Sequence, residues 1–289
     1  DLIQSESSAF IKSYGPGNLS TTSIRGASAN QTSVIFNGFN INSPMNGISD
    51  LSLIPVCFFD DMHIQYGGSG TLWGSGNIGG SIHLDNTPVF NKGINMSAGS
   101  SIGSFNNLRH NFNIIYSGKK WTSKIKAFHL SAENDFPFYN TALSDTPLQY
   151  QTNSELKQTG LLFENFFKLD KSQDLELIIW YQNNERQIPP NMLKLEDKST
   201  QSDESLRITT EWRKSFGENE VYIRSALFNE SILYEDISSE TISSSMSSTV
   251  ISEIEAKFKT GKDQLLSFGL NNTNTSAKAD AYNGNIKQI

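Results

Sequence analysis

The chain has 289 residues, with 23 basic and 30 acidic side chains and a net charge of −7, so no basic stripe is available to neutralise a phosphate backbone and nucleic-acid binding is excluded. Its single cysteine, Cys57, excludes an intramolecular disulfide framework. The sequence also lacks an apolar run of the ~18 residues that a membrane-spanning helix needs, although alternating barrel strands would fit the mean hydropathy of −0.40 as well.

The first residues have neither a basic start nor an apolar core, so they do not form a secretory signal and the chain is expected to begin inside a domain. Apolar pairs at 2–3 and 10–11 stand at helical spacing ahead of the turn sequence YGPGN at 14–18. This spacing predicts a short helix before the turn.

A glycine-rich turn runs directly into a strand at 72–84, LWGSGNIGGSIHL. Gly74, Gly76 and Gly79 match the dinucleotide-binding pattern G-x-G-x-x-G. That pattern has to follow a strand, open a helix and precede an acidic residue by about 20 positions. The segment that follows alternates as a strand does, so a dinucleotide site is rejected.

Together with two upstream segments, this stretch resembles the plug domain of TonB-dependent outer-membrane receptors. The segments SIRG at 23–26, VIFNGFNIN at 34–42 and the glycine-rich 72–84 occur in the order in which the family shows its I-R-G, D-G-x-x-x-N and G-G-x-I-x-I motifs. The resemblance covers roughly residues 1–88. It implies an α+β plug domain over 1–87, with the segment that binds the inner-membrane coupling protein missing from this chain.

After residue 87 the pattern changes to long alternating segments separated by polar connections. These segments exceed the usual strand length of about 5–6 residues, as a tilted membrane barrel requires. We expect nine strands, at 92–103, 107–117, 120–133, 155–169, 173–187, 204–215, 219–234, 248–260 and 264–276.

The alternation predicts one apolar outer face for these strands, because side chains two residues apart share a face. The residues assigned to that lipid-facing surface are Leu161, Phe163, Ile208, Trp212, Ile254, Phe258, Leu266 and Phe268.

Short connections at 117–119, 170–172, 217–218 and 261–262 alternate with longer ones predicted near 136–154, 188–203 and 235–247. Outer-membrane barrels have short periplasmic turns and long extracellular loops in this order. Aromatic residues also cluster beside the short turns, as an interfacial girdle would, although aromatic residues are favoured in strands generally.

The sequence offers no catalytic, cofactor or metal centre. The histidines at 63, 83, 110 and 129 lack the paired spacing of metal ligands and are assigned to strands. Asp60 and Asp61 are adjacent, so in a strand they point to opposite faces and are read as turn or plug-surface carboxylates. With no nucleophile elbow, phosphate loop or H-E-x-x-H motif, the chain is not expected to be an enzyme, and it needs no cofactor.

Arg25 is the candidate plug–barrel contact. An arginine packed inside a barrel needs an anionic or carbonyl partner, and the resemblance implies that Arg25 seats the plug against carboxylates of the barrel wall. An exposed surface arginine is the alternative. Where the family often reads E-x-x-R-G-P, this chain has HIQYGG at 63–68, so that the ion pairing of the plug is expected to be reduced or rearranged.

Ligand capture is predicted on plug segment 41–47 and on the outer connection around 136–140. The candidate ligand-binding residues are Asn42, Met45, Asn46 and Tyr139. Methionine and aromatic side chains give adaptable apolar contacts, and asparagine supplies hydrogen bonds. Ordinary solvated loops are the alternative for each residue.

The resemblance therefore implies an α+β plug followed, over 88–289, by the first strands of an up-and-down transmembrane β-barrel. Plugged barrels have around 22 strands, so nine cannot close the cylinder and the chain is expected to be a piece of a longer protein. The implied function is import of a scarce small molecule, a siderophore or cobalamin, across the outer membrane, with outer-membrane lipid and the TonB complex as partners. The competing interpretation is a soluble or surface-attached all-β adhesion protein with serine-rich loops.

Overall fold

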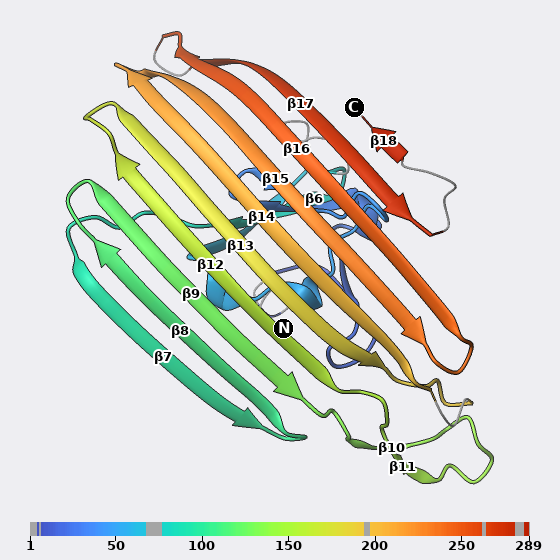
Figure 1. Ribbon diagram of the computed structural model, residues 1–289. Helices are drawn as coiled ribbons and strands as arrows, with labels where there is room; N and C mark the ends of the chain where they lie inside the picture. The colour runs from blue at the N-terminus through green and yellow to red at the C-terminus, as the bar shows by residue number, and fades with distance from the viewer. Residues whose placement is uncertain are drawn as a thin grey trace.

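The computed structural model describes residues 5, 7–67, 77–193, 197–261, 264–280 and 286–288. A long, curved antiparallel sheet, called the wall here, bends around a smaller N-terminal lobe formed by the described residues up to Asp85 (Figure 1). Within the described residues, no helix has the length and apolar character to cross a membrane.

Nine long strands of the wall follow one another in chain order, and a short tenth strand, β18 (Ile286–Gln288), pairs with the last of them. Each pairing is antiparallel, which confirms the nine predicted strands and their up-and-down order. The long strands are β7 (Gly93–Gly103), β8 (Asn107–Ser117), β9 (Trp121–Ala132), β12 (Leu156–Lys168), β13 (Gln173–Ile188), β14 (Ser199–Phe216), β15 (Asn219–Asp236), β16 (Thr241–Lys259) and β17 (Leu265–Ala279).

Long connections lie at one end of the wall, but not all where the sequence predicted them. The connection between β9 and β12 carries its own hairpin, β10 (Pro137–Tyr139) with β11 (Leu148–Tyr150). The predicted long connection at 235–247 is wrong, because β15 continues to Asp236 and β16 begins at Thr241. The serine-rich stretch pairs there with apolar and aromatic residues of β15, so its backbone is in the ladder and not in a loop.

The lobe contains a four-stranded sheet in the order β4-β3-β6-β5, in which β3 and β6 are parallel. Its other elements are a short hairpin and three single-turn 3₁₀ helices. The bounds are β1 (Phe10–Ser13), β2 (Ser20–Ser23), η1 (Ala29–Gln31), β3 (Thr32–Phe36), β4 (Phe39–Asn40), η2 (Leu51–Leu53), η3 (Val56–Phe58), β5 (Asp61–Tyr66) and β6 (Gly80–Asp85).

The predicted N-terminal helix is wrong at residues 10–11, which lie in β1. The turn after Ser13 brings β2 alongside, and Ile11 pairs with Thr22. Ladder hydrogen bonds satisfy this backbone more fully than a single helical turn could. The other half of the helical pattern, at 2–3, and the glycines at 74 and 76 lie outside the described residues, whereas the strand predicted after the glycines is β6.

Asn37 and Gly38 form the tight turn between β3 and β4, with positive φ angles of 44° and 87°. This Asn-Gly pair supplies the left-handed conformations that a two-residue hairpin needs. The Asn37 side chain also accepts from the backbone N–H of Asn86 at 2.8 Å, which holds the start of the link to the wall beside the turn.

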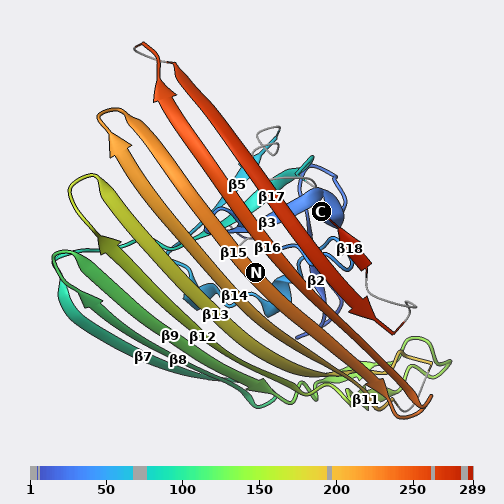
Figure 2. The same ribbon diagram turned by 45° about the horizontal axis from the view of Figure 1, so that its top comes forward.

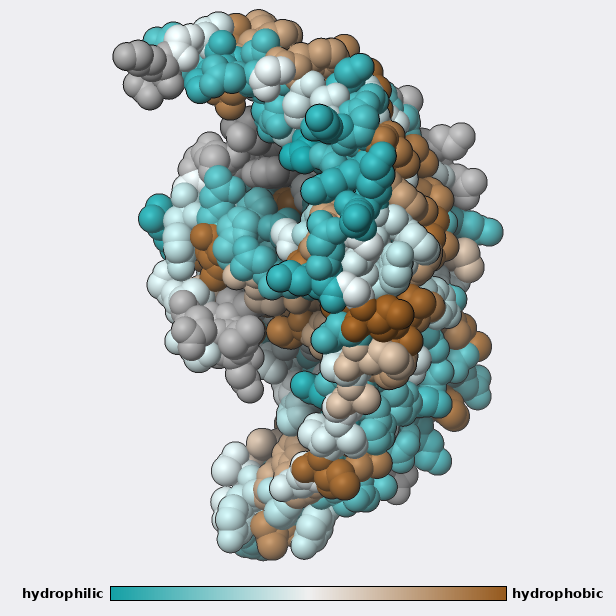
Figure 3. All heavy atoms as spheres, turned by 90° about the vertical axis from the view of Figure 1, so that its left-hand side faces the viewer, coloured by the Kyte–Doolittle hydropathy of each residue, from teal (hydrophilic) through white to brown (hydrophobic). Residues whose placement is uncertain are grey.

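The register of the wall puts one set of side chains on its convex side, away from the lobe. Tyr181 of β13 lies beside Leu161, and Ile179 lies beside both Phe163 and Ile208. Paired residues share a face of the sheet, so these side chains lie on the same side of β12, β13 and β14. The eight residues predicted to share one face do so, and that face is the one opposite the lobe. Figures 2 and 3 show the wall curving around the lobe on its other side.

Aromatic packing joins the lobe to the concave side of the wall. Trp180 is fully buried, with its ring centroid 5.1 Å from that of Phe36 and 5.6 Å from that of Phe59. Phe58 of the lobe packs edge-on against Phe128 of the wall at 5.3 Å. These contacts make one hydrophobic core shared by the two parts.

Gly160 makes this close approach possible. A Cβ atom there would lie 2.4 Å from a ring carbon of Phe128 and 3.1 Å from Phe58. We expect Gly160→Ala to lower the free energy of unfolding by about 1–3 kcal/mol, the usual cost of overpacking. Urea titration of the refolded chain in detergent, followed by tryptophan fluorescence, measures this. Gly99→Ala is the matched control, since its added Cβ comes no closer than 3.9 Å to a neighbour, and equal losses in the two variants would contradict the packing argument.

Candidate functional site

Asp50 fixes the lobe to the wall near the end with the long connections. One carboxylate oxygen accepts from the backbone N–H of Ser20 at 2.9 Å and of Ser52 at 3.0 Å, so the side chain caps η2 and ties it to β2. The other oxygen pairs with the Arg186 guanidinium of β13 at 2.9 Å. Asp203 of β14 lies on the far side of Arg186, at 3.6 Å.

Amide side chains of the wall bind the backbone of the same lobe segment. Gln158 donates to the carbonyl of Ser52 at 3.0 Å, and Gln182 donates to the carbonyl of Leu53 at 2.6 Å. Gln182 is itself held by Trp180, whose indole N–H donates to the Gln182 amide oxygen at 3.1 Å. The wall therefore binds η2 in two ways: its amide side chains bond the η2 carbonyl groups, and Arg186 pairs with the Asp50 carboxylate.

Asp60 makes the second charged contact, nearer the end with the short turns. Its carboxylate bridges the ammonium groups of Lys124 and Lys126, both buried on β9, with 2.7 Å between Oδ1 and the Lys126 Nζ. The two lysines also donate to the carbonyls of Thr87 and Phe58, at 2.6 and 2.8 Å respectively. Each lysine thus spans the gap between wall and lobe.

The Asp60 contact is retained at neutral pH. Partial burial raises the pKa of the Asp60 carboxyl, but hydrogen bonds from Lys124 and Lys126 outweigh that effect and hold the pKa below its ordinary value of 3.8. Because the Asp60 pKa is lower in the folded state than in the unfolded state, the contact stabilises the protein fully at pH values above the ordinary pKa. This stabilisation is lost as the pH falls through the lowered pKa of the folded state.

The charges run opposite to the prediction made for Arg25. At both contacts the lobe supplies the carboxylate and the wall supplies the cation, whereas the prediction had a lobe cation meeting wall carboxylates. Asp60 and Asp61 contact different groups: Asp60 meets the wall lysines, and Asp61 lies beside His63 within the lobe. Arg25 is exposed, has a positive φ of 53°, and places its guanidinium 5.2 Å from the ring centroid of Tyr66 within the lobe. Among the described residues Arg25 has no recorded contact with the wall, so its predicted plug–barrel contact stays a prediction.

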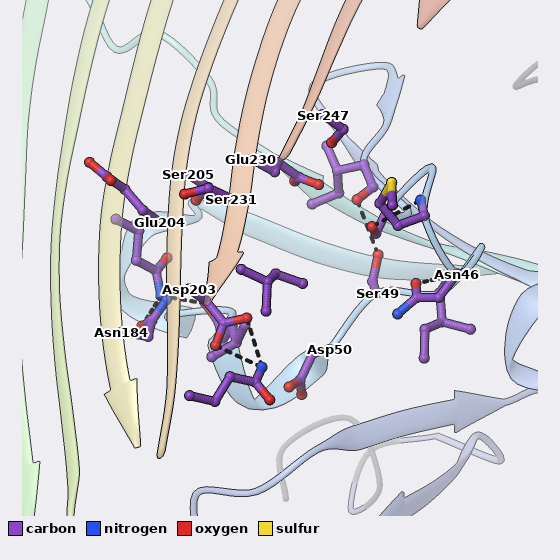
Figure 4. Close-up of a pocket in the computed structure, with 18 of the residues that line it drawn as sticks. Asn46, Ser49, Asp50, Asn184, Asp203, Glu204, Ser205, Glu230, Ser231 and Ser247 are labelled. Atoms are coloured by element: carbon purple, nitrogen blue, oxygen red, sulfur yellow. Dashed lines mark hydrogen bonds between the residues drawn. The ribbon is translucent and has the colours of Figure 1, made fainter. Parts of the chain in front are cut away.

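A cavity of about 320 Å³ opens between lobe segment 41–54 and the concave side of β13 to β16. Met45 and Asn46, two of the predicted ligand-binding residues, line it from the lobe. Figure 4 shows Asn46, Ser49 and Asp50 on the lobe side of this space, facing Asp203, Ser205 and Glu230 of the strands.

The other two predicted residues lie elsewhere. Asn42 holds the cavity-lining segment in shape: its oxygen accepts from the Val34 N–H at 2.9 Å, and its amide donates to the Thr32 and Gly47 carbonyls at 3.1 and 3.0 Å. Tyr139 is exposed on the β10–β11 hairpin and is not among the residues that line the cavity.

The cavity combines apolar side chains from the lobe with hydroxyl and charged groups from the wall. Its charges are largely paired with each other: Arg186 with Asp50 and Asp203, and Arg207 with Glu230 at 2.5 Å. Arg207 also stacks 4.6 Å from the Trp180 ring centroid. Such a site offers hydrogen bonds and apolar contact to a polar organic molecule, and its lining carboxylates outnumber its guanidinium groups by four to two.

Sequence reasoning missed the residues that anchor the lobe, namely Asp50, Asp60, Lys124, Lys126 and Arg186. One signal was available in part: Lys124 and Lys126 alternate with Ile125 and Ala127, so both lysines had to face the concave side. Their partners lie 64 and 66 residues away, and no local pattern identifies them.

The family model for the TonB-dependent receptor plug domain matches residues 1–81. The lobe is therefore the part of the chain that is similar to the plug domain of TonB-dependent receptors. A relative of this plug, the vitamin B12 transporter BtuB of Vibrio vulnificus (strain YJ016), is 35% identical to the chain over 90 residues, which are 31% of this chain and 15% of the transporter.

Solved structures of transporters and uptake receptors share the fold of lobe and wall together. The FrpB iron transporter from Neisseria meningitidis superposes with a TM-score of 0.76 at 12% identity, over 97% of this chain and 45% of its own. The ferric yersiniabactin uptake receptor FyuA from Yersinia pestis gives 0.73 at 13%, over 97% and 45%, and the copper transporter OprC gives 0.74 at 14%, over 94% and 42%. The chain spans less than half the length of each of these structures.

Asp60→Asn tests the contact between Asp60 and the two wall lysines, which lies nearer the end with the short turns. We expect a loss of roughly 2–3 kcal/mol in the free energy of unfolding, below the 3–5 kcal/mol of a fully buried pair, because the Asp60 side chain is 29% exposed and Glu164 stays within 3.5 Å of both lysines. Urea titration followed by tryptophan fluorescence measures the change.

The control for Asp60 is Asp174→Asn, which removes the same charge from a half-exposed pair with Arg213 and should cost less than about 1 kcal/mol. An Asp60→Asn variant no less stable than this control would show that the lysines do not hold the plug.

Proposed function

We propose that the chain is the plug, residues 1–87, and the first barrel strands, 88–289, of an outer-membrane active transporter for a scarce small molecule. The observation that carries the proposal is the seating of the plug in the concave side of the wall, anchored by Asp50 and Asp60 and packed around Trp180. A plug held this firmly closes the space that the wall surrounds. An adhesion protein has no use for such an arrangement.

Ligand capture is assigned to the cavity between segment 41–54 and strands β13 to β16. It lies at the end of the wall with the long connections, which in outer-membrane barrels is the outer side. The BtuB relative is a vitamin B12 transporter, and FyuA takes up ferric yersiniabactin. The mixture of apolar and hydrogen-bonding groups suits contact with part of a cobalamin or a siderophore, since a cavity of about 320 Å³ cannot enclose a whole cobalamin.

Import then requires the plug to move, with energy from the TonB complex of the inner membrane. Movement has to separate Asp50 from Arg186 and Asp60 from the two lysines. Arg25, exposed on the plug, is assigned to the remaining strands of the barrel in the full-length protein. Tyr139 and the β10–β11 hairpin are assigned to the outer rim, where they meet the ligand first.

The convex side of the wall suits outer-membrane lipid. Its apolar residues share one parity across the strands, and aromatic rings collect beside the short turns: Trp121 stacks on Phe167 at 6.2 Å and lies 5.0 Å from Tyr116. Aromatic girdles of this kind mark the membrane interface in barrels.

The double variant Met45→Ala with Asn46→Ala tests the capture site in the full-length receptor. We expect it to weaken cell-surface binding of cobalamin or of a ferric siderophore by about tenfold or more, as loss of one apolar contact and one hydrogen bond implies. Val56→Ala is the control, an exposed apolar truncation outside the residues that line the cavity. Unchanged binding across a panel of both ligand classes, at equal receptor abundance, would move the site elsewhere.

Ile254→Arg tests the lipid-facing surface. In lipid vesicles the full-length receptor should lose on the order of 2 kcal/mol of stability, the lower end of the range for a barrel midplane. The reason is that Ile254 lies only four residues from Phe258, whose ring packs against Phe268 near the short turn at 261–262. Ile254→Ala separates the charge from the lost side chain. Equal stability of the Arg and Ala variants would contradict the assignment.

A further inference from the structure

Two histidines twenty residues apart in the sequence meet on adjacent strands of the plug. His63 of β5 and His83 of β6 stand opposite each other in the antiparallel register, with ring centroids 4.6 Å apart and planes 6° apart. Asp61 and Asp85 form the next pair on the same face. The His63 Nδ1 lies 3.4 Å from the Asp85 Oδ2 and 3.7 Å from the Asp61 Oδ2.

This cluster is turned away from the wall. Residues of the opposite parity, Met62, Ile64, Ile82 and Leu84, belong to the hydrophobic core shared with Trp180. The histidines and aspartates therefore occupy the other face of the plug sheet, where a hollow of about 470 Å³ is lined by His63, His83 and Asp85. This places them apart from the proposed capture cavity.

We propose that His63, His83 and Asp85 bind a divalent transition-metal ion, with Asp61 as a fourth ligand. Two imidazoles and carboxylate oxygens form a donor set that suits Zn²⁺, Ni²⁺ or Cu²⁺ better than Mg²⁺ or Ca²⁺. One ligand atom from each of the three principal residues lies within 4.8 Å of the others.

The ligand atoms lie close enough together for one ion to reach them after side-chain rotation. Metal–ligand bonds of about 2.0–2.2 Å at tetrahedral angles leave ligand atoms roughly 3.3–3.6 Å apart. The distances from the His63 Nδ1 to the two carboxylates, 3.4 and 3.7 Å, are near this spacing and longer than the ~2.9 Å of a good hydrogen bond. The half-exposed His63 ring has room to turn from the stacked position so that both imidazoles reach one ion.

A neighbouring hydroxyl completes the site. The Ser81 Oγ lies 2.8 Å from the His83 Nε2 in a buried contact. In the metal-bound form the Nε2–H donates to Ser81, which fixes the ring and presents the Nδ1 to the ion, as outer partners do for metal-bound histidines. Because the ligands stand on paired strands, the backbone ladder positions them before the ion binds.

Zinc titration of the refolded whole chain, freed of metal and held in detergent, tests the proposal by calorimetry. We expect one Zn²⁺ per chain, a rise in the unfolding temperature with added Zn²⁺, and visible absorption of bound Co²⁺. His63→Gln and Asp85→Asn should each weaken Zn²⁺ binding by about tenfold or more. The His63 side chain is half-exposed and the Asp85 side chain is partly exposed, so the fold should tolerate both substitutions.

His110→Gln and His129→Gln are the matched controls, because each removes a histidine from a wall strand outside the cluster. Zn²⁺ binding that is unchanged in both cluster variants, or that falls equally in the control variants, would overturn the proposal. These measurements do not involve transport, so a negative result would contradict the metal site without contradicting the proposed transporter function.

Discussion

Buried cations on the concave side of the wall are the constraint on which the rest of the structure depends. Lys124, Lys126 and Arg186 face inward because the alternation of their strands leaves them no other side, and a buried charge without a partner is strongly destabilising. The plug supplies Asp60 to the lysines and Asp50 to the arginine. The plug is therefore fixed at both ends of the wall, and the aromatic core around Trp180 fills the space between.

The same anchors shape the capture cavity. Asp50 caps η2 and holds Arg186 with a single carboxylate, so the segment that contains Met45 and Asn46 is placed against β13 to β16 by the contact that seats the plug. Under the proposed function, ligand binding in this cavity would be linked to plug position through Asp50. A ligand that displaced Arg186 from Asp50 would weaken the contact that holds the plug near the end with the long connections.

The wall also carries acidic partners for these cations: one carboxylate shared by the two lysines and another beside Arg186. Glu164 lies 3.5 and 3.3 Å from the two lysine ammonium groups, and Asp203 lies 3.6 Å from the Arg186 guanidinium. We infer that displacement of the plug does not leave these cations alone, because the wall carboxylates can take up the pairing. Under the proposed function, this alternative pairing would lower the electrostatic barrier to plug movement.

The sequence predicted the wall well and the contacts of the plug poorly, for physical reasons. Alternation such as that of Val250 to Phe258 is a local property, so strands, their parity and the convex apolar face could all be read from it. The serine-rich start of β16 has no apolar alternation, and only its pairing with β15 makes it a strand. Arg25 was a local candidate, whereas Asp50 with Arg186 and His63 with His83 meet only after distant segments fold together.

A double-mutant cycle on Asp50 and Arg186 tests most directly whether plug carboxylates and wall cations hold the two parts together. Asp50→Asn, Arg186→Gln and the double variant would be compared with the unaltered chain by urea titration in detergent. A direct pair at 2.9 Å predicts a coupling free energy of roughly 1–3 kcal/mol, with the double variant less impaired than the sum of the single ones. Strictly additive losses would mean that the two side chains act independently and that another interaction seats the plug.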